Sequence, residues 1–527
     1  MARSAYLARV LGTLAISGAL ALGCVCSQAQ TAAAGTVLRA RLKSDIVSTN
    51  PGTRRDENTD AVLLHVVEGL VASREDGSPA PMLASSWTVS ADGRVYTFTL
   101  RPDVVFHNGA PLTAAQVIWS LQRYLKPQTH WRCLADFGPH GIARIVSMTA
   151  PDPHTVIITL DRAAPMFLIT LLRADCGGTG ILHPDSVDAD GNWRTPIGTG
   201  PFEMGEWRHN QFIELNRFAH YSPLPGPRDG NAGGKHALVD HIRFLIIPDS
   251  SAARAALIRG SLDILDNLAA SELTGIRGRP DLKFQLAPIL DCYALLIQTR
   301  DPLLSDLRLR TAIALTIDTA GLTKAITWGT GSANNSPIPV ASPFHGPVEV
   351  PLRQPDVAQA RRLARAAGYD GRAIQLVTSR RDPQMFDAAV VIQAMAAQAG
   401  IHLQIDTVDW PAHLSRYTVG NYQLMVQSFS ARLDPTLSFG IFIGDKREEP
   451  RKAWDTPGSR ELLEQAMASA DPAARQAVFD TLTRDFLAEV PAVVLFNSAR
   501  LSAVRSNVTG YENWMAAQQR LWGVGLN

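Results

Sequence analysis

The sequence predicts an α/β protein with two lobes, a β-rich first half and a second half in which strands and helices alternate. Its 527 residues exceed the roughly 150 residues of a typical domain several times over. Hydrophobic residues make up 46% and charged residues 19% of the chain, which is typical of a globular protein and not of a disordered one. The 50 basic and 49 acidic residues nearly cancel. We therefore expect no nucleic-acid partner and no anionic membrane surface as a partner.

The N-terminus has the pattern of an export signal. Arg3 and Arg9 precede an apolar run over residues 10–25, and the small residues Ser27 and Ala29 follow it. We predict that residues 1–29 are a signal peptide and that the mature protein lies in the periplasm. A lipid attached to Cys24 is the alternative route of processing.

The first half alternates short strands with turn signals. Strands are predicted at 87–89 and 95–100 around the turn pair Asp92-Gly93, because apolar and polar residues alternate on both sides of it. Thr113 is a candidate N-cap for a helix over 114–125. A strand at 155–160 follows, and a second β-rich stretch begins near Gly198.

The second half has a different pattern. A strand is predicted at 373–378, a helix at 383–399 that ends before Gly400, and a strand at 401–408 with a two-residue period. A helix capped by Asp356 is predicted just upstream, over 357–367. The strand–helix–strand order predicts a parallel pair of strands joined by a crossover helix.

Three cysteines remain once the signal peptide is removed. An oxidising compartment permits one disulfide and leaves one thiol over. We favour a bond between Cys133 and Cys176, which lie in the same early segment, with Cys292 free. Three unpaired, buried thiols are the alternative.

Motifs of catalysis and cofactor binding are absent from the sequence. It has no G-x-S-x-G, H-E-x-x-H or G-x-x-x-x-G-K-[ST] pattern. His130 and Cys133 could share a helical turn, but a metal site needs further ligands. We expect no enzymatic activity, no cofactor and no metal site, with an exported hydrolase of unrecognised mechanism as a remote alternative.

Four segments, in order along the chain, carry a resemblance to one family. They are Tyr96–Val117, Gly198–Phe202, Asp306–Asp318 and Ser336–Pro339. These segments resemble landmarks of the extracellular solute-binding proteins of peptide-type ABC importers (family 5), which include dipeptide-, oligopeptide- and nickel-binding proteins. The resemblance implies a two-lobed periplasmic-binding-protein type II fold with an extra β-rich subdomain. It also implies a monomer that closes around its ligand by hinge motion and delivers it to a permease with ATPase subunits.

The resemblance further implies how the lobes divide the sequence. Lobe I is expected to be discontinuous and to carry the extra subdomain as an insertion. The expected ranges are 36–60, 190–287 and 490–527 for lobe I, 61–189 for the subdomain and 288–489 for lobe II.

Ligand contacts are expected near an Asp-Pro pair. In peptide-binding relatives an acidic residue three positions before this pair holds the peptide's amino group, but that position is Ala431 here, ahead of Asp434-Pro435. The neighbouring Arg432 presents a planar fork of donors that suits a carboxylate or phosphate. A solvated arginine and a helix-capping Asp434 are the structural alternatives.

Other candidate contacts lie in loops at strand ends. A polar loop between the first strand and an apolar helix over 61–70, which Thr59 or Asp60 could cap, contributes three of them. Arg380 follows the strand at 373–378 at its carboxyl end, where open α/β sheets bind ligands. Trp410 and Phe429 could offer flat apolar surfaces to ligand side chains, with buried packing at the hinge as the alternative. The full set of predicted contacts is Arg54, Arg55, Asn58, Arg380, Trp410, Phe429, Ser430, Arg432 and Asp434.

These expectations combine into one functional hypothesis. The protein captures a short peptide or similar small polar solute in a cleft between its lobes and hands it to a permease. A non-peptide cargo such as a metal chelate, haem, opine or oligosaccharide is the alternative within the same role.

Overall fold

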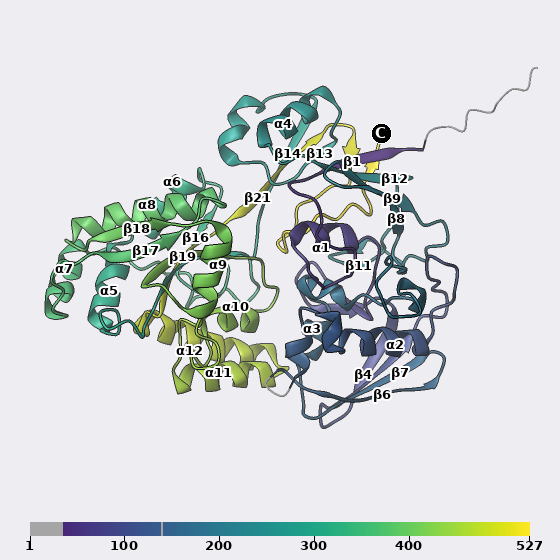
Figure 1. Ribbon diagram of the computed structural model, residues 1–527, viewed down its shortest axis with the longest axis horizontal. Coiled ribbons are helices and arrows are strands. Elements are labelled where there is room, and N and C mark those ends of the chain that lie inside the picture. Colours follow the sequence, from purple (N-terminus) through teal and green to yellow (C-terminus); the bar gives the residue numbers. More distant parts are fainter. Residues whose placement is uncertain (1–34, 139–140) are drawn as a thin grey trace, which may run out of the picture. The chain divides into compact units, whose positions relative to one another are not determined.

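Two large β-sheets organise the chain in a computed structural model that describes residues 35–138 and 141–527 (Figure 1). Residues Thr36–Asn527 form one compact unit. The expected signal peptide and Cys24 lie outside the described residues. No helix of the described part is long and apolar enough to cross a membrane. We call the sheet that contains the first strand lobe I and the other large sheet lobe II.

The lobe I sheet takes its seven strands from both ends of the chain, in the order β14-β21-β13-β1-β12-β9-β8. Its first strand, β1 (Val37–Leu42), pairs in parallel with β12 and β13. The other strands are β8 (Phe202–Arg208), β9 (Phe212–Arg217), β12 (His241–Ile246), β13 (Ile264–Leu265), β14 (Leu282–Pro288) and β21 (Ala499–Arg505). Since β21 pairs with β14, lobe I is discontinuous in sequence. Helix α4 (Ser250–Arg259) follows β12.

A four-stranded antiparallel sheet, in the order β4-β5-β7-β6, forms a subdomain within residues 61–189. The hairpin of β4 and β5 confirms the two strands predicted on either side of Asp92-Gly93. Gln116 accepts a hydrogen bond from the N–H of Thr113 (2.9 Å) at the start of α2, so the predicted cap is also confirmed. The elements are β4 (Ala84–Val89), β5 (Val95–Leu100), α2 (Ala114–Tyr124), β6 (Ile145–Asp152), β7 (Thr155–Leu160) and α3 (Phe167–Leu171). Short strand pairs elsewhere are β2 (Val71–Ser73) with β3 (Pro79–Pro81), β10 (Arg228–Asp229) with β11 (Ala232–Gly233), and β22 (Val508–Thr509) with β23 (Gly525–Leu526).

The lobe II sheet has the order β16-β20-β15-β19-β17-β18. Strands β17 and β18 are parallel and α8 connects them, which confirms the predicted crossover. The strands are β15 (Cys292–Ile297), β16 (Ser332–Ala333), β17 (Ile374–Thr378), β18 (Leu403–Thr407), β19 (Leu424–Phe429) and β20 (Ala492–Asn497). The helices are α5 (Leu307–Thr316), α6 (Thr319–Ile326), α7 (Val357–Ala366), α8 (Pro383–Gln398), α9 (Trp410–Val419), α10 (Pro435–Phe442), α11 (Pro457–Ala468) and α12 (Pro472–Glu489).

Hydrophobic clusters cover both faces of the lobe II sheet. All six residues of β15 are buried. Its odd-numbered residues belong to one cluster and its even-numbered residues to another. A sheet covered on both faces needs apolar residues at every position, so its strands are continuous hydrophobic runs without alternation.

Strand β20 corrects the predicted boundary of lobe II at residue 489. It pairs with β15, so lobe II extends to Asn497 and the chain returns to lobe I only at β21. All six residues of β20 are buried. A run of this kind has no polar face to indicate which sheet it joins.

Helix α1 begins and ends earlier than the predicted helix over 61–70. It runs from Glu57 to Leu63, and its N-cap is Asp56, whose carboxylate accepts a hydrogen bond from the N–H of Thr59 (2.9 Å). Beyond the helix, the carbonyl oxygens of His65, Val66 and Glu68 accept hydrogen bonds from the N–H groups of Phe202, Gly200 and Ile181, so they do not extend it. A Cβ atom at Gly69 would lie only 2.4 Å from the carbonyl oxygen of Gly178, a distance that excludes any side chain there.

Candidate functional site

Loops at the carboxyl ends of three lobe II strands contain three of the predicted ligand residues. Strands β17, β18 and β19 run in the same direction, with Thr378 opposite Thr407 and Val377 opposite Met425. β17 and β18 therefore end level with each other, and β19 ends on the same side of the sheet after continuing to Phe429. Arg380 follows β17, Trp410 follows β18 and Ser430 follows β19, so this end of the sheet has the polar and aromatic groups that small-molecule sites use.

Two arginines at this end of the sheet stack on aromatic rings. The guanidinium of Arg380 lies 3.6 Å from the ring centroid of Phe386, and that of Arg381 lies 4.8 Å from the ring of Trp410. Such cation–π contacts hold a guanidinium in place without using its N–H groups. Both arginines can therefore still donate hydrogen bonds to a carboxylate.

Phe429 and Asp434 have partners inside lobe II. Phe429 is buried and packs edge-on against aromatic rings of α9 and α10. Asp434 is the N-cap of α10, accepts from the N–H of Thr436 (2.9 Å) and forms a buried ion pair with Arg475 (2.7 Å). These contacts give both residues structural roles, and their contact with a ligand stays a prediction.

The predicted contacts of lobe I lie in the loop between β1 and α1. Arg54 is exposed and has a left-handed backbone conformation (φ 43°). Arg55 forms an ion pair with Asp60. Burial opposes the charge of Arg55, but this carboxylate outweighs burial and raises the arginine's pKa. The amide of Asn58 donates to the carbonyl (3.0 Å) and hydroxyl (2.7 Å) oxygens of Ser44, so it supports the loop.

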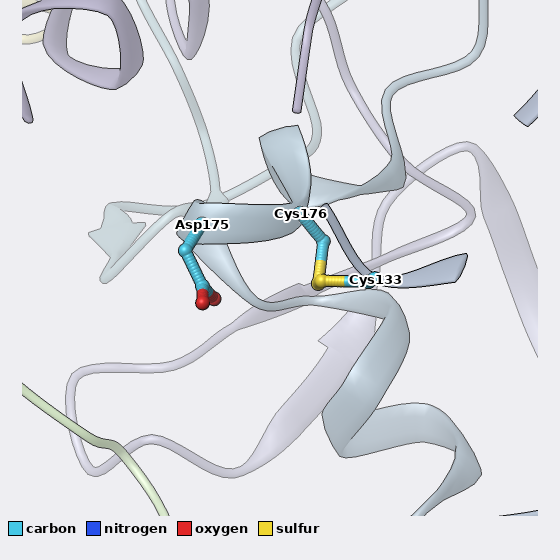
Figure 2. Close-up of side chains that lie close together, drawn as sticks. All are labelled: Cys133, Asp175 and Cys176. Atoms are coloured by element: carbon cyan, nitrogen blue, oxygen red, sulfur yellow. A yellow bond between two sulfur atoms is a disulfide. The ribbon is translucent and has the colours of Figure 1, made fainter. Parts of the chain in front are cut away.

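A disulfide joins Cys133 and Cys176, the favoured pair (Figure 2). Cys292 is free and buried. Asp175 presents its carboxylate within 4.8 Å of both bonded sulfurs. Sulfurs in a disulfide are not thiolates and so do not serve as metal ligands. The bond instead fixes the position of the segment that carries Asp175.

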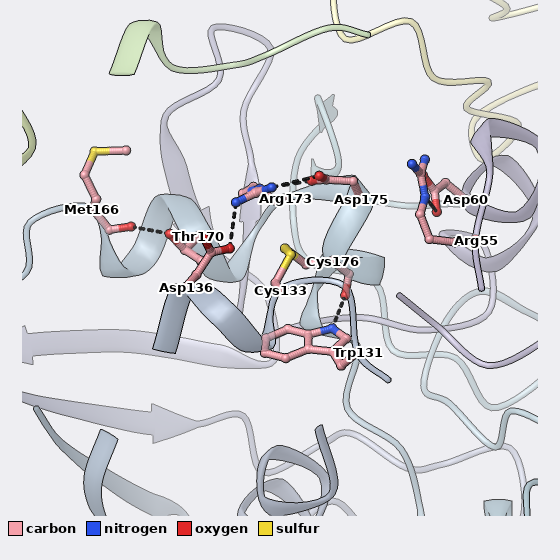
Figure 3. Close-up of a disulfide and its surroundings, with 10 residues drawn as sticks. All are labelled: Arg55, Asp60, Trp131, Cys133, Asp136, Met166, Thr170, Arg173, Asp175 and Cys176. Carbon is pink, nitrogen blue, oxygen red and sulfur yellow. Dashed lines mark hydrogen bonds and ion pairs between the residues drawn. A yellow bond between two sulfur atoms is a disulfide. The ribbon is translucent and has the colours of Figure 1, made fainter. Parts of the chain in front are cut away.

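This segment contains a charged cluster that the sequence did not indicate. Arg173 donates to Asp136 (2.8 Å) and, through two nitrogens, to Asp175 (3.0 and 2.8 Å) (Figure 3). Burial raises the pKa of Asp175, but Arg173 outweighs burial and holds this pKa well below its usual range. The available signal was the predicted disulfide itself, because it brings the residues around Cys133 and Cys176 together.

The loop between β19 and α10 reaches from lobe II to lobe I. Leu433 packs against the lobe I core. The hydroxyl of Thr436 and the guanidinium of Arg475 both contact the sulfur of Met166, at 3.7 and 3.6 Å. The loop that contains Ser430 and Arg432 is therefore part of the contact between the lobes.

Two chain segments connect the lobes, residues 289–291 and Ser498, and we call them the hinge. Asp291 accepts hydrogen bonds from the N–H (2.7 Å) and the hydroxyl of Ser498. Burial raises the pKa of Asp291 to about 7, and the nearby carboxylate of Asp382 adds to this effect, while Ser498 and Arg500 oppose it. This carboxyl group therefore titrates at the junction of the lobes.

Stability is expected to fall between about pH 4 and pH 7 because of Asp291. A raised pKa means that the folded protein holds this proton more tightly than the unfolded chain, so stability decreases as the pH rises toward about 7. A tenfold difference in proton affinity between the two states corresponds to about 1.4 kcal/mol. The Asp291→Asn variant should lose less stability over this range than the wild type. Urea denaturation at pH 5 and pH 7 measures the difference, and identical pH dependence in the two proteins would contradict the assignment.

The described residues also form two cavities, and both are lined by residues outside lobe II. One, of about 640 Å³, is lined by Glu75, Phe284, Gln285, Leu286, Ala287, Glu512 and Asn513. The other, of about 370 Å³, is lined by Arg217, Phe218, Ala219, Tyr221, Pro223, Lys235, His236, Ala237 and Leu238. Neither lining includes a predicted ligand residue.

Comparison with known proteins identifies the family. The model of the bacterial extracellular solute-binding proteins, family 5 (middle), matches residues 78–448, which is more than half of the chain. This chain belongs to that family. The family is one of substrate-binding transport proteins, so the chain is a solute-binding component of the kind that serves ABC importers.

Relatives and solved structures of the family cover nearly the whole chain. The dipeptide-binding protein of Escherichia coli K12 is 25% identical over 489 residues, 87% of this chain and 88% of its own. The ABC transporter-associated periplasmic binding protein DppA of Helicobacter pylori, solved with the peptide STSA, has a TM-score of 0.77 and is 23% identical. The match covers 93% of this chain and 98% of that protein. A binding protein of A. tumefaciens R10, solved with agropinic acid, has a TM-score of 0.75, is 23% identical and covers 93% and 99%. These similarities confirm the two-lobed periplasmic-binding-protein fold.

Proposed function

We propose that the protein captures a short peptide or a similar small polar solute between its lobes and delivers it to a membrane permease with ATPase subunits. The observation that carries this proposal is that Arg380, Trp410 and Ser430 each follow a strand at the same end of the lobe II sheet. The contact between the adjoining loop and lobe I supports it, because a ligand at this end of the sheet would be enclosed when the lobes close.

The residues at this end of the sheet suit the ends and side chains of a peptide. Arg380 supplies a cationic donor for a terminal carboxylate. Trp410 offers a flat apolar surface for a side chain. Arg54, exposed on lobe I, is the candidate that approaches from the opposite side.

Export to the periplasm belongs to the same proposal. Residues 1–29 would direct it, and relatives with this role are described as periplasmic. A disulfide is typical of proteins in that compartment, because it oxidises thiols. The working unit is proposed to be a monomer.

A non-peptide cargo is the second candidate within this role. It is favoured by Ala431, a residue without charge at the position where the resemblance predicts an acidic anchor for a peptide's amino group. The relative solved with agropinic acid is an example of such a cargo in the same fold.

Thermal-shift screening of the purified mature protein tests the function. A ligand that binds only the folded state at 100 times its Kd stabilises that state by about 2.7 kcal/mol, which should raise the Tm by several degrees. The panel contains di- to pentapeptides, amino acids, opines, metal chelates and oligosaccharides. Small-angle scattering should show a more compact protein with any ligand that raises the Tm.

The Arg380→Gln variant tests the proposed contact with a ligand carboxylate. It should bind a carboxylate-bearing ligand at least tenfold more weakly than the wild type and unfold at nearly the same temperature without ligand. A protein that no solute of the panel stabilises would contradict the proposed function.

A further inference from the structure

The loop between β19 and α10 holds Arg432 in a fixed position. The N–H of Arg432 donates to the carbonyl oxygen of Leu290 in the hinge (3.1 Å). Its Nη1 donates to the carbonyl (3.1 Å) and hydroxyl (3.0 Å) oxygens of Ser430 and to the carbonyl oxygen of Ala431 (3.1 Å). Backbone and side chain are therefore both bonded at the place where lobe II meets lobe I.

The other side of the same guanidinium has no partner. Its Nε and Nη2 donate to no acceptor in residues 35–138 and 141–527. These two nitrogens form the edge with which an arginine binds a carboxylate through two parallel hydrogen bonds. The bonds of Nη1 orient this edge without occupying it.

Cations outnumber available anions around Arg432. Burial lowers the pKa of its guanidinium, Asp175 opposes this effect, and Arg173, Arg132 and Arg55 reinforce it. Asp175 is already bonded to Arg173.

The remaining members of the cluster do not supply a free anion. Arg173 also binds Asp136, and Arg55 is paired with Asp60 (Figure 3). The exposed side chain of Arg132 has no acceptor among the described residues. Two arginines, Arg132 and Arg432, therefore lack a carboxylate partner.

We propose that this cluster is a carboxylate-binding subsite and that the natural ligand is an acid with a carboxylate at this end. The inference rests on the proposed function, because it assigns a substrate class to the same site between the lobes. A carboxylate here would bond to Nε and Nη2 of Arg432 and offset the local excess of positive charge. An ammonium group would instead meet unpaired arginines, and no unpaired carboxylate of the described cluster would stabilise it.

Three dialanine probes isolate the charge at one end of a ligand. N-succinyl-Ala-Ala has a carboxylate at its amino end, N-acetyl-Ala-Ala is neutral there, and Ala-Ala has a free ammonium group. The expected result is at least tenfold tighter binding of the succinyl probe than of either other probe, measured by calorimetry at physiological ionic strength. Equal affinities, or tighter binding of Ala-Ala, would overturn the inference.

Variants assign the preference to Arg432. Arg432→Gln should weaken the succinyl probe at least tenfold and change the affinity of the acetyl probe less than twofold, and Arg432→Lys should retain part of the preference. The matched control is Arg484→Gln, an exposed arginine of α12 (side chain 60% exposed), which should leave all affinities unchanged. A succinyl preference that survives in Arg432→Gln would overturn the assignment.

The thermal-shift screen separates the two proposals. If other solutes stabilise the protein but all of them are neutral or cationic, the carboxylate subsite is wrong while the transport function stands. If no solute stabilises it, the transport function itself fails.

Discussion

Replacing Cys133 with serine is expected to lower the free energy of unfolding by about 4 kcal/mol. The disulfide to Cys176 closes a loop with a sequence separation of 43. Closing a loop of this length removes chain entropy from the unfolded state equivalent to about 4 kcal/mol at 25 °C. The effect should be large for function too, because the bond holds the segment with Arg173 and Asp175. Urea denaturation of the variant and the wild type measures the loss.

Reduction of the wild type provides an independent measurement of the same bond. Dithiothreitol should lower the stability of the wild type by about as much as the substitution does, and it should not affect Cys133→Ser. The Cys292→Ala variant keeps the disulfide, so it should lose the same increment on reduction as the wild type. A reduced wild type as stable as the oxidised protein would show that the bond does not stabilise the fold.

Replacing Arg500 with leucine is expected to cost about 3–5 kcal/mol, the range for removing one partner of a buried ion pair. Arg500 is at the start of β21, where the chain re-enters lobe I. Its side chain, 9% exposed, binds Asp266 (3.1 Å), Glu57 (2.5 Å) and the carbonyl oxygen of Ala517 (2.6 Å). Burial opposes its charge, but both carboxylates outweigh burial and raise its pKa. Without it, the largely buried carboxylate of Asp266 would lose its cationic partner. Chemical denaturation of the Arg500→Leu variant measures the cost.

The two carboxylates that Arg500 binds separate burial from charge. Glu57 is 68% exposed and Asp266 is 14% exposed. The Glu57→Gln variant should therefore lose less than about 1 kcal/mol. Adding Asp266→Asn to Arg500→Leu should restore part of the lost stability, because it removes the unpaired buried charge. A double variant no more stable than Arg500→Leu would contradict this account.

Local patterns predicted the elements whose faces differ in polarity. The hairpin around Asp92-Gly93 has alternating residues and a turn pair, and the helix over 383–398 ends just before Gly400. Each of these signals acts over a few neighbouring residues, so it is readable without knowledge of the fold. The family resemblance supplied the discontinuous division of the sequence between the two lobes, which no local pattern contains.

The remaining features depend on contacts between distant residues. β20 is buried on both faces, so its sequence is compatible with either sheet. The sequence offered Thr59 or Asp60 as the cap of the first helix, but α1 begins earlier, with Asp56 as its N-cap. The pairing of Arg55 with Asp60 likewise depends on where the helix begins.

Parts of the candidate site also depend on contacts between distant residues, so the sequence did not indicate them. Strand ends predicted Arg380 and Trp410, because their place follows from the order of elements. The cluster around Arg173 depends on the fold of the subdomain, which brings Asp136 to it across 37 positions of the sequence. No spacing in the sequence specifies such a contact.

The hinge limits how far nearby side chains move when the lobes close, and so affects the order of events during capture. The two segments that connect the lobes are hydrogen-bonded to each other, since the N–H of Ile289 donates to the carbonyl oxygen of Ser498 (3.2 Å). A ribbon of this kind bends about one axis. A group close to a pivot travels least when a body swings, and Arg432 is tied to Leu290 at that pivot. The guanidinium of Arg432 therefore moves little as the lobes close. A solute can bind it first, while the parts of the two lobes farther from the hinge are still separated.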